Sequence, residues 1–125
     1  MKEDSILQRS DNWKGNNYMQ PFTVNVIKII QSIPRGKVMT YGQIAKAAGS
    51  NRAARQVVRI LHSMSEKYNL PWHRVVNASG KLTIPTEEGK LLQQHLLEKE
   101  GVIFEKDEQL SLKSYMYDPI EFWEK

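Results

Sequence analysis

The chain of 125 residues contains no cysteine. This absence excludes a disulfide framework, a zinc site built on thiolates and a thiol nucleophile. Long apolar runs are missing too: none approaches the roughly 18 residues that a membrane span needs, so we expect a soluble protein with no membrane partner. The first four residues lack the apolar segment of a secretory signal. The three histidines, His62, His73 and His95, sit at no metal-ligand spacing, so we expect neither a metal nor another cofactor.

The charges are unevenly distributed along a chain whose net charge is +4. Residues 21–76 hold nine lysines and arginines against one acid, Glu66, whereas residues 86–125 hold ten acids against five bases. A basic middle favours a polyanionic partner such as nucleic acid. The alternative is an ordinary solvated surface that happens to be polarised.

The length predicts one domain with one modest core. Residues 1–20 are polar, and we expect a loose arm, pinned at most by Trp13 or Tyr18. Residues 21–106 form the predicted domain, and residues 107–125 are predicted to be a tail packed on it. Apolar residues recur at helical spacing and predict a helix over residues 23–32, before a turn at residues 34–37; they are Phe22, Val26, Ile27, Ile30 and Ile33.

A pair of helices is predicted next. Thr40 and Gln43 have the spacing of a capping box, which predicts a helix over residues 41–48 that stops at Gly49. Ser50 is expected to cap a second helix at once, over residues 51–64. Its buried face is predicted to hold Ala54, Val57, Val58 and Leu61, and its opposite face Arg52, Arg55 and Arg59. This pattern indicates a helix-turn-helix with the second helix as recognition helix, or else a plain helical hairpin with a solvated arginine face.

The remainder predicts a small wing and a last helix. Pro71 stops any continuing helix, and residues 75–76 and 82–84 flank a turn, which predicts a β-hairpin. Residues 87–100 predict a helix that buries Leu91, Leu92 and Leu96 and is capped by Gly101, before a strand at residues 102–104. The tail is expected to pack through its aromatic residues: Tyr115, Tyr117, Phe122 and Trp123. The fold class is therefore mainly α, a winged helix-turn-helix with a small β-hairpin wing.

Four blocks in register resemble one family. Residues 33–42 (IPRGKVMTYG), 53–57 (AARQV), 71–77 (PWHRVVN) and 96–102 (LLEKEGV) resemble the DNA-binding domain of the O6-alkylguanine-DNA alkyltransferases. The third block resembles their reactive loop, Pro-Cys-His-Arg-Val, with Trp72 in place of the cysteine. That replacement is typical of the alkyltransferase-like proteins, and the chain is identified as a member of them. The resemblance implies a non-enzymatic protein that binds O6-alkylguanine in double-stranded DNA through the minor groove.

The resemblance also implies roles for individual residues. Arg55 is the expected arginine finger, which enters the base stack where the flipped nucleotide was; the alternative is one more phosphate contact. His73 and Glu100, which activate the thiol in the enzymes, are expected to be a structural hydrogen-bonded pair rather than a relay. The expected lesion pocket comprises Tyr41, Trp72, His73, Arg74, Val75 and Glu100, with backbone groups of residues 85–89. The expected DNA contacts are Tyr41, Gln43, Ser50, Asn51, Arg52, Ala54, Arg55 and Arg59.

Trp72 either lines this pocket, which we favour, or fills it and abolishes base binding. A non-reacting protein must hand the lesion on, and the resemblance implies recruitment of nucleotide excision repair proteins by a monomer, which is cytoplasmic (nucleoid-associated in a bacterium, nuclear in a eukaryote). One alternative is a winged-helix transcription regulator without lesion specificity. Another is an enzyme with a different nucleophile, for which the candidates are Ser63, Ser65, Ser79 and Thr83.

Overall fold

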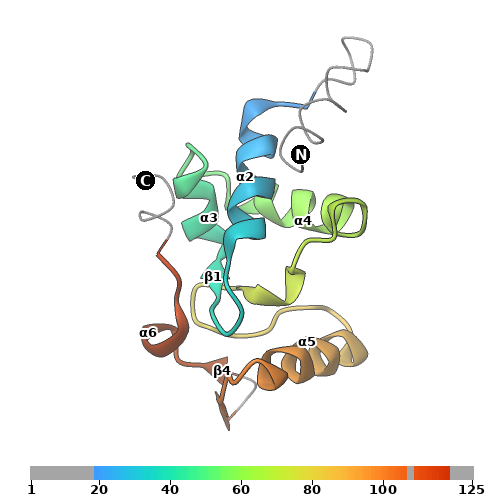
Figure 1. Cartoon of the computed structure of the whole chain (residues 1–125), viewed down its shortest axis with the longest axis vertical. Helices are drawn as coiled ribbons and strands as arrows, with labels where there is room; N and C mark the ends of the chain where they lie inside the picture. Colours follow the sequence, from blue (N-terminus) through green and yellow to red (C-terminus); the bar gives the residue numbers. More distant parts are fainter. Residues whose placement is uncertain (1–18, 107–108, 119–125) are drawn as a thin grey trace.

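The computed structural model describes residues 19–106 and 109–118. The predictions for the arm up to residue 18, including Trp13 and Tyr18, lie outside the described residues, as do those for Phe122 and Trp123. Helix α2 (Pro21–Ser32) starts with proline in its first turn, where a missing N–H costs nothing. It buries five apolar side chains and packs against α3 (Tyr41–Ala47) and α4 (Ala54–Tyr68) (Figure 1). The predicted first helix is confirmed, with a start two residues earlier.

The capping box of α3 is confirmed. The Thr40 hydroxyl accepts from the Gln43 amide at 3.0 Å, and the Gln43 side chain accepts from the Thr40 amide at 3.3 Å. Gly49, with a φ of 116°, ends the helix as predicted.

The expectation that Ser50 caps the next helix is wrong. Its amide donates to Ala45 O at 2.9 Å, so Ser50 belongs to the Schellman closure of α3. The chain then makes a further turn, with Ala53 N on Ser50 O at 3.2 Å, and α4 begins at Ala54 without a side-chain cap.

Helix α4 also differs from its predicted bounds and face. It runs to Tyr68 rather than to residue 64. The cap residue Asn69 has a left-handed φ of 53°, a conformation that asparagine tolerates better than most residues. Val57 and Leu61 are buried as predicted, but Val58 is 44 % exposed. Ile60, not Val58, completes the buried face.

The predicted pairing of residues 75–76 with residues 82–84 is wrong. Strand β2 (Val75–Val76) pairs in parallel with β1 (Met39–Thr40), more than thirty residues earlier in the chain. The predicted turn between residues 76 and 82 is confirmed, because the Asn77 carboxamide oxygen accepts from the amides of Ser79 and Lys81. Within the described residues the antiparallel pair is formed instead by β3 (Phe104–Glu105) and β4 (Gln109–Leu110). Strand β3 lies slightly later than the predicted residues 102–104.

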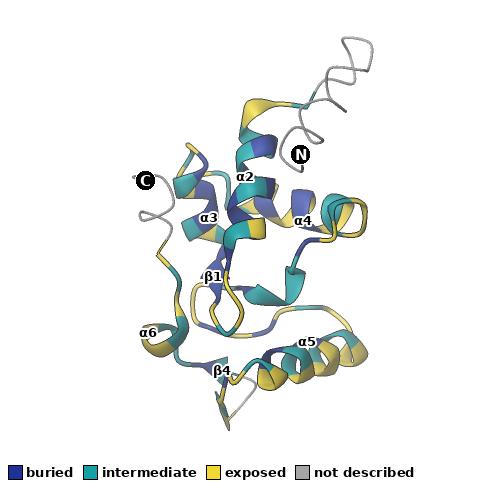
Figure 2. Ribbon diagram, viewed as in Figure 1, coloured by how far each residue is buried: buried dark blue, intermediate teal, exposed yellow. Residues whose placement is uncertain are grey.

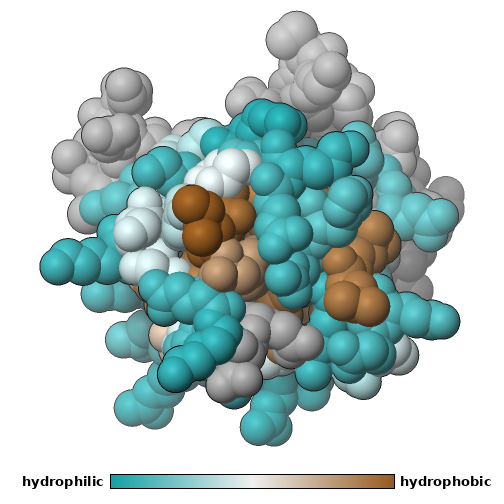
Figure 3. Space-filling view, turned by 90° about the horizontal axis from the view of Figure 1, so that it is seen from below, coloured by the Kyte–Doolittle hydropathy of each residue, from teal (hydrophilic) through white to brown (hydrophobic). Residues whose placement is uncertain are grey.

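Helix α5 (Glu87–Lys99) is confirmed, but its predicted buried face is wrong. The Thr86 hydroxyl caps its start, and Gly101 (φ 99°) ends it, with Val102 N on Leu97 O. Leu91 and Leu92 are 56 % and 49 % exposed, and Leu96 is half-buried. The buried residues are Gln93 and Leu97, one turn apart. Seen from below, apolar side chains therefore interrupt an otherwise hydrophilic surface (Figure 3).

Two apolar cores lie on either side of the parallel strand pair (Figure 2). Val75 packs into the core of α2, α3 and α4, whereas the next residue, Val76, packs with Leu97 and Val102 of the α5 side. Neighbouring strand residues point to opposite faces, so β1 and β2 join the cores. Tyr115, the last residue of α6 (Leu112–Tyr115), and Tyr117 after it are partly buried against the two cores, as predicted for these two residues. The structure confirms a mainly helical fold with small strand pairs.

Candidate DNA-lesion site

The loop between α4 and β2 is held by one carboxylate. Residues 72–74 form a 3₁₀ turn, η2 (Trp72–Arg74). The Glu100 carboxylate receives His73 Nε2 at 2.8 Å and the Arg74 guanidinium through two nitrogens, at 3.1 and 2.8 Å. It also accepts from the Gly36 amide at 2.9 Å, while Arg74 Nη1 donates to Ile33 O at 2.8 Å. The expected His73–Glu100 pair is confirmed, and Arg74 completes it.

The electrostatics of this cluster favour the charged carboxylate. Burial opposes ionisation, but hydrogen bonds from Arg74, Gly36 and His73 outweigh it and hold the pKa of Glu100 at about 2. A carboxylate with so many donors is a fixed anchor. The cluster therefore sets the position of the loop rather than offering a group for proton transfer.

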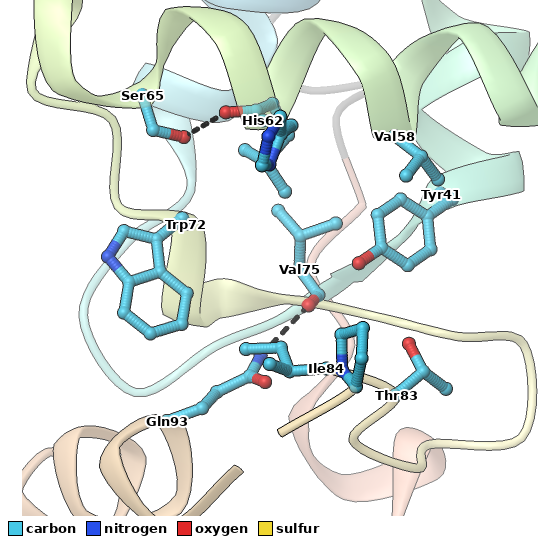
Figure 4. A pocket seen from close by; sticks show the side chains of 11 residues that line it. Tyr41, Val58, His62, Ser65, Trp72, Val75, Thr83, Ile84 and Gln93 are labelled. Carbon is cyan, nitrogen blue, oxygen red and sulfur yellow. Dashed lines mark hydrogen bonds between the residues drawn. The ribbon is translucent and has the colours of Figure 1, made fainter. Parts of the chain in front are cut away.

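A cavity of about 560 Å³ opens beside this loop (Figure 4). Helix α4 forms one wall, η2 and β2 form the next, and the segment before α5 closes the third. The lining residues are Tyr41, Val58, Leu61, His62, Ser65, Trp72, Val75, Thr83, Ile84, Pro85 and Gln93.

Trp72 stands at the edge of this cavity and is partly buried. Its six-membered ring faces the cavity, while the indole N–H points away from it (Figure 4). The ring meets His73 edge-on, with centroids 6.1 Å apart. In this structure the indole is a wall of an open cavity.

Tyr41, the first residue of α3, faces Trp72 across the cavity (Figure 4). Burial raises the pKa of its phenol above the usual value, and a hydrogen bond with Thr83 offsets this in part. The phenol thus stays neutral and presents an apolar ring with one polar end to the cavity.

The structure brings together three of the six predicted pocket residues in the lining: Tyr41, Trp72 and Val75. The other three, His73, Arg74 and Glu100, are not in the lining. They form the charged cluster that anchors the loop. Sequence reasoning missed the wall from α4 and missed Gln93. A glutamine one turn before Leu97, on the face that packs inward, was the available signal for Gln93.

The predicted DNA contacts gather around the start of α4. Ser50, Asn51 and Arg52 lie in the turn before it, and Ala54 is its first residue. The side chains of Arg52, Arg55 and Arg59 are exposed, and none forms an ion pair within the described part of the chain. Gln43 differs, because both ends of its amide are engaged, by Thr40 N and by Tyr117 O at 2.6 Å.

Residues 19–106 and 109–118 hold no cluster of side chains able to ligate a metal ion. The same residues include no helix that is long and apolar enough to cross a membrane.

Comparison with known proteins now identifies this arrangement. Residues 21–102 match the family model of the 6-O-methylguanine DNA methyltransferase DNA-binding domain. The chain is 39% identical over 103 residues to a DNA base-flipping protein of Vibrio parahaemolyticus, covering 81% of this chain and 100% of that one. It is 36% identical over 106 residues to alkyltransferase-like protein 1 of Schizosaccharomyces pombe, covering 81% and 98%.

The structure of the S. pombe protein in complex with damaged DNA containing O6-carboxymethylguanine superposes with a TM-score of 0.72, at 35% identity, over 81% of this chain and 98% of that one. An O6-methylguanine methyltransferase of Mycobacterium tuberculosis superposes with a TM-score of 0.53, at 34% identity, over 66% of this chain and 49% of the enzyme. With the domain match, these relatives show that the chain belongs to the alkyltransferase-like family.

Proposed function

We propose that this protein recognises O6-alkylguanine in double-stranded DNA by flipping the base into the cavity beside Trp72, and that it leaves the lesion chemically intact. The observation that carries the proposal is the open cavity of about 560 Å³ between the recognition helix and the loop of the family's reactive motif. That volume lies within the roughly 300–1,000 Å³ of small-ligand pockets. The names of the relatives, a base-flipping protein and a protein solved with damaged DNA, support it.

The chemistry of the loop favours binding without repair. Alkyl transfer needs a nucleophile, and the chain has no cysteine to supply a thiolate. An indole in its place has no available lone pair, because the nitrogen pair belongs to the aromatic system. Ser65, one of the alternative nucleophiles, donates its hydroxyl to Leu61 O inside α4, so the hydroxyl is engaged by the helix backbone and not by His62, which lines the cavity one turn earlier. Thr83 lines the cavity with Tyr41, whose pKa is raised by burial, so the phenol stays neutral and is a poor general base.

The exposed arginines supply the DNA contacts in this proposal. Three exposed guanidinium groups, of Arg52 in the turn before α4 and of Arg55 and Arg59 on the helix, suit a phosphate backbone. Arg55 is the finger that enters from the minor groove and fills the gap left in the base stack by the flipped base. A planar guanidinium can do this because it stacks on the neighbouring bases and donates hydrogen bonds at the same time. The full contact set is Tyr41, Gln43, Ser50, Asn51, Arg52, Ala54, Arg55 and Arg59.

A reversible complex must pass the lesion to another system. We propose that the bound, distorted DNA attracts nucleotide excision repair proteins, and that the protein acts as a monomer. The C-terminal third is acidic, so its charge does not favour contact with DNA. We propose it as the region that binds such a partner.

The deciding experiment compares two duplexes that differ at one base. Binding is measured with guanine or O6-methylguanine at the same position, and the lesion is quantified after incubation by digestion and mass spectrometry. We expect tighter binding of the lesion duplex with the methyl group retained. Equal affinity for both duplexes contradicts lesion recognition, and loss of the methyl group contradicts a non-enzymatic role.

A further inference from the structure

Gln93 is a buried polar residue at the floor of the cavity. The residue is 3 % exposed, yet it belongs to the lining (Figure 4). The amide nitrogen donates to His73 O and to Val75 O, each at 3.1 Å. Both acceptors belong to the loop that carries Trp72, so α5 holds this loop through Gln93 as well as through the last turn of the helix.

The two hydrogen bonds fix which way the amide faces. Carbonyl oxygens can only accept, so the NH₂ group must point at His73 and Val75, and both of its hydrogens are used. The carbonyl oxygen, Oε1, is consequently turned to the other side. It forms no hydrogen bond within the described residues. Gln93 therefore presents one oriented acceptor that no described residue engages.

The other polar side chains that line the cavity are more exposed than Gln93. Tyr41 is partly buried, and Thr83 is exposed. The Ser65 hydroxyl donates to Leu61 O, and the Trp72 N–H is directed out of the cavity. His62 is exposed at the rim. A ligand that enters thus meets mainly apolar walls and the Gln93 acceptor, whose orientation is fixed by the hydrogen bonds of its own amide nitrogen.

The chemistry of the proposed ligand selects what this acceptor can bind. Alkylation at O6 removes the proton from N1, so the base edge of an O6-alkylguanine keeps a single donor, the 2-amino group, beside the acceptors N1, N3, N7 and O6. We infer that Gln93 Oε1 accepts a hydrogen bond from the 2-amino group of the flipped base and thereby selects 2-aminopurines that carry a 6-alkoxy group. This inference rests on the proposed function, because it names the contact that orients the base in the same cavity.

The selection follows from desolvation. A base with the 2-amino group satisfies Oε1, whereas a 6-alkoxypurine without it buries Oε1 against a C–H and leaves the acceptor unpaired. We expect wild-type protein to bind a duplex with O6-methylguanine about tenfold more tightly than one with 6-methoxypurine at the same position.

The test uses the substitution Gln93→Lys. A lysine ammonium retains donors for His73 O and Val75 O but has no acceptor, so the loop keeps its tether while the contact to the base is lost. Affinities of wild type and variant are measured for both duplexes, and the ratio of the two affinities is compared. Differences in duplex stability and the added charge affect both proteins or both duplexes, so they cancel in that comparison. Gln94→Lys, one residue along α5 and outside the cavity lining, is the matched control for charge.

We expect the preference for the 2-amino base to fall from about tenfold to nearly one in Gln93→Lys and to persist in Gln94→Lys. An unchanged ratio in Gln93→Lys overturns the inference and assigns the amino group to a backbone carbonyl or to no contact. A wild type that prefers O6-methylguanine over guanine but does not distinguish it from 6-methoxypurine also overturns it, while the proposed function stands. A wild type without any preference for the lesion rejects the proposed function itself.

Discussion

Arg55 and Arg59 are both exposed on helix α4, yet the proposed mechanism assigns them different roles in DNA binding. Replacing Arg55 with alanine removes the group that compensates for the unstacked base. We expect it to weaken binding of O6-methylguanine duplexes by about 1–3 kcal/mol, the size of a stacking contact with a base. Fluorescence anisotropy with lesion and undamaged duplexes measures the two affinities.

Arg59→Ala is the matched control for this arginine pair. A phosphate contact stabilises all DNA alike, so both duplexes should lose affinity equally and the salt dependence should flatten by roughly one counterion. If Arg55→Ala binds both duplexes as Arg59→Ala does, Arg55 is another phosphate contact and the finger assignment fails.

A substitution at Trp72 tests whether the indole lines the cavity or fills it. Because its ring faces an open cavity, Trp72→Ala should remove apolar contact with the flipped base and weaken lesion binding by about 1–3 kcal/mol. Titration of both duplexes measures this, with thermal unfolding as the check on folding. Tighter binding by the alanine variant would mean that the indole occupies space the base needs.

At the scale of elements, the capping box of α3 places Tyr41, since the helix begins at that residue. Thr40→Ala removes the hydroxyl that accepts from Gln43 N, and we expect the free energy of unfolding to fall by about 1 kcal/mol. Thr40→Ser keeps the acceptor and should stay close to wild type. Urea denaturation compares the three proteins, and equal loss in both variants would assign the effect to the threonine methyl group instead.

Elements defined by neighbouring residues were the predictable ones. The capping box, the glycine stops at Gly49 and Gly101, and the helix after Thr86 each depend on a few consecutive side chains. The parallel pairing of β1 with β2 depends on two distant segments that share a side of two cores, and no local pattern encodes it.

The buried face of α5 could not be predicted for a related reason. An apolar pattern assigns leucines 91 and 92 to the buried face before a glutamine. Gln93 is nevertheless buried, and its amide nitrogen donates to the carbonyl oxygens of His73 and Val75. The family motifs located the loop and its anchor, since these residues lie within the blocks at residues 71–77 and 96–102 that resemble the family. The cavity itself needed the tertiary placement of α4 over that loop.

At the scale of the whole molecule, Glu100 joins parts that are far apart in the sequence. Its carboxylate is shared by the loop of residues 72–74, the turn at Gly36 and the end of α5, and Arg35 adds a bond to Lys99 O at 3.1 Å. The two cores are therefore linked by the strand pair on one side and by this charged cluster on the other. A change at Glu100 should be felt as lost global stability and not as a local defect.

This linkage predicts a specific dependence of stability on pH. The folded pKa of Glu100 is about 2, below the roughly 4.3 of an unperturbed glutamate, so the folded state binds the proton less readily than the unfolded state. The stabilisation is complete above the unfolded pKa and is lost as pH falls through the window toward 2. Glu100→Gln removes the charge beside His73 and the Arg74 guanidinium, whose side chains are 14% and 18% exposed.

We therefore expect Glu100→Gln to lower the free energy of unfolding by about 3 kcal/mol at pH 7, at the lower end for a broken buried pair. The difference from wild type should shrink steadily between pH 5 and pH 2.5. Glu98→Gln, an exposed position on the same helix, is the control and should show a small, nearly constant difference. Denaturant unfolding across this pH range provides the measurement. A gap between wild type and Glu100→Gln that stays constant down to pH 2.5 would show that the carboxylate contributes through packing and not through its charge.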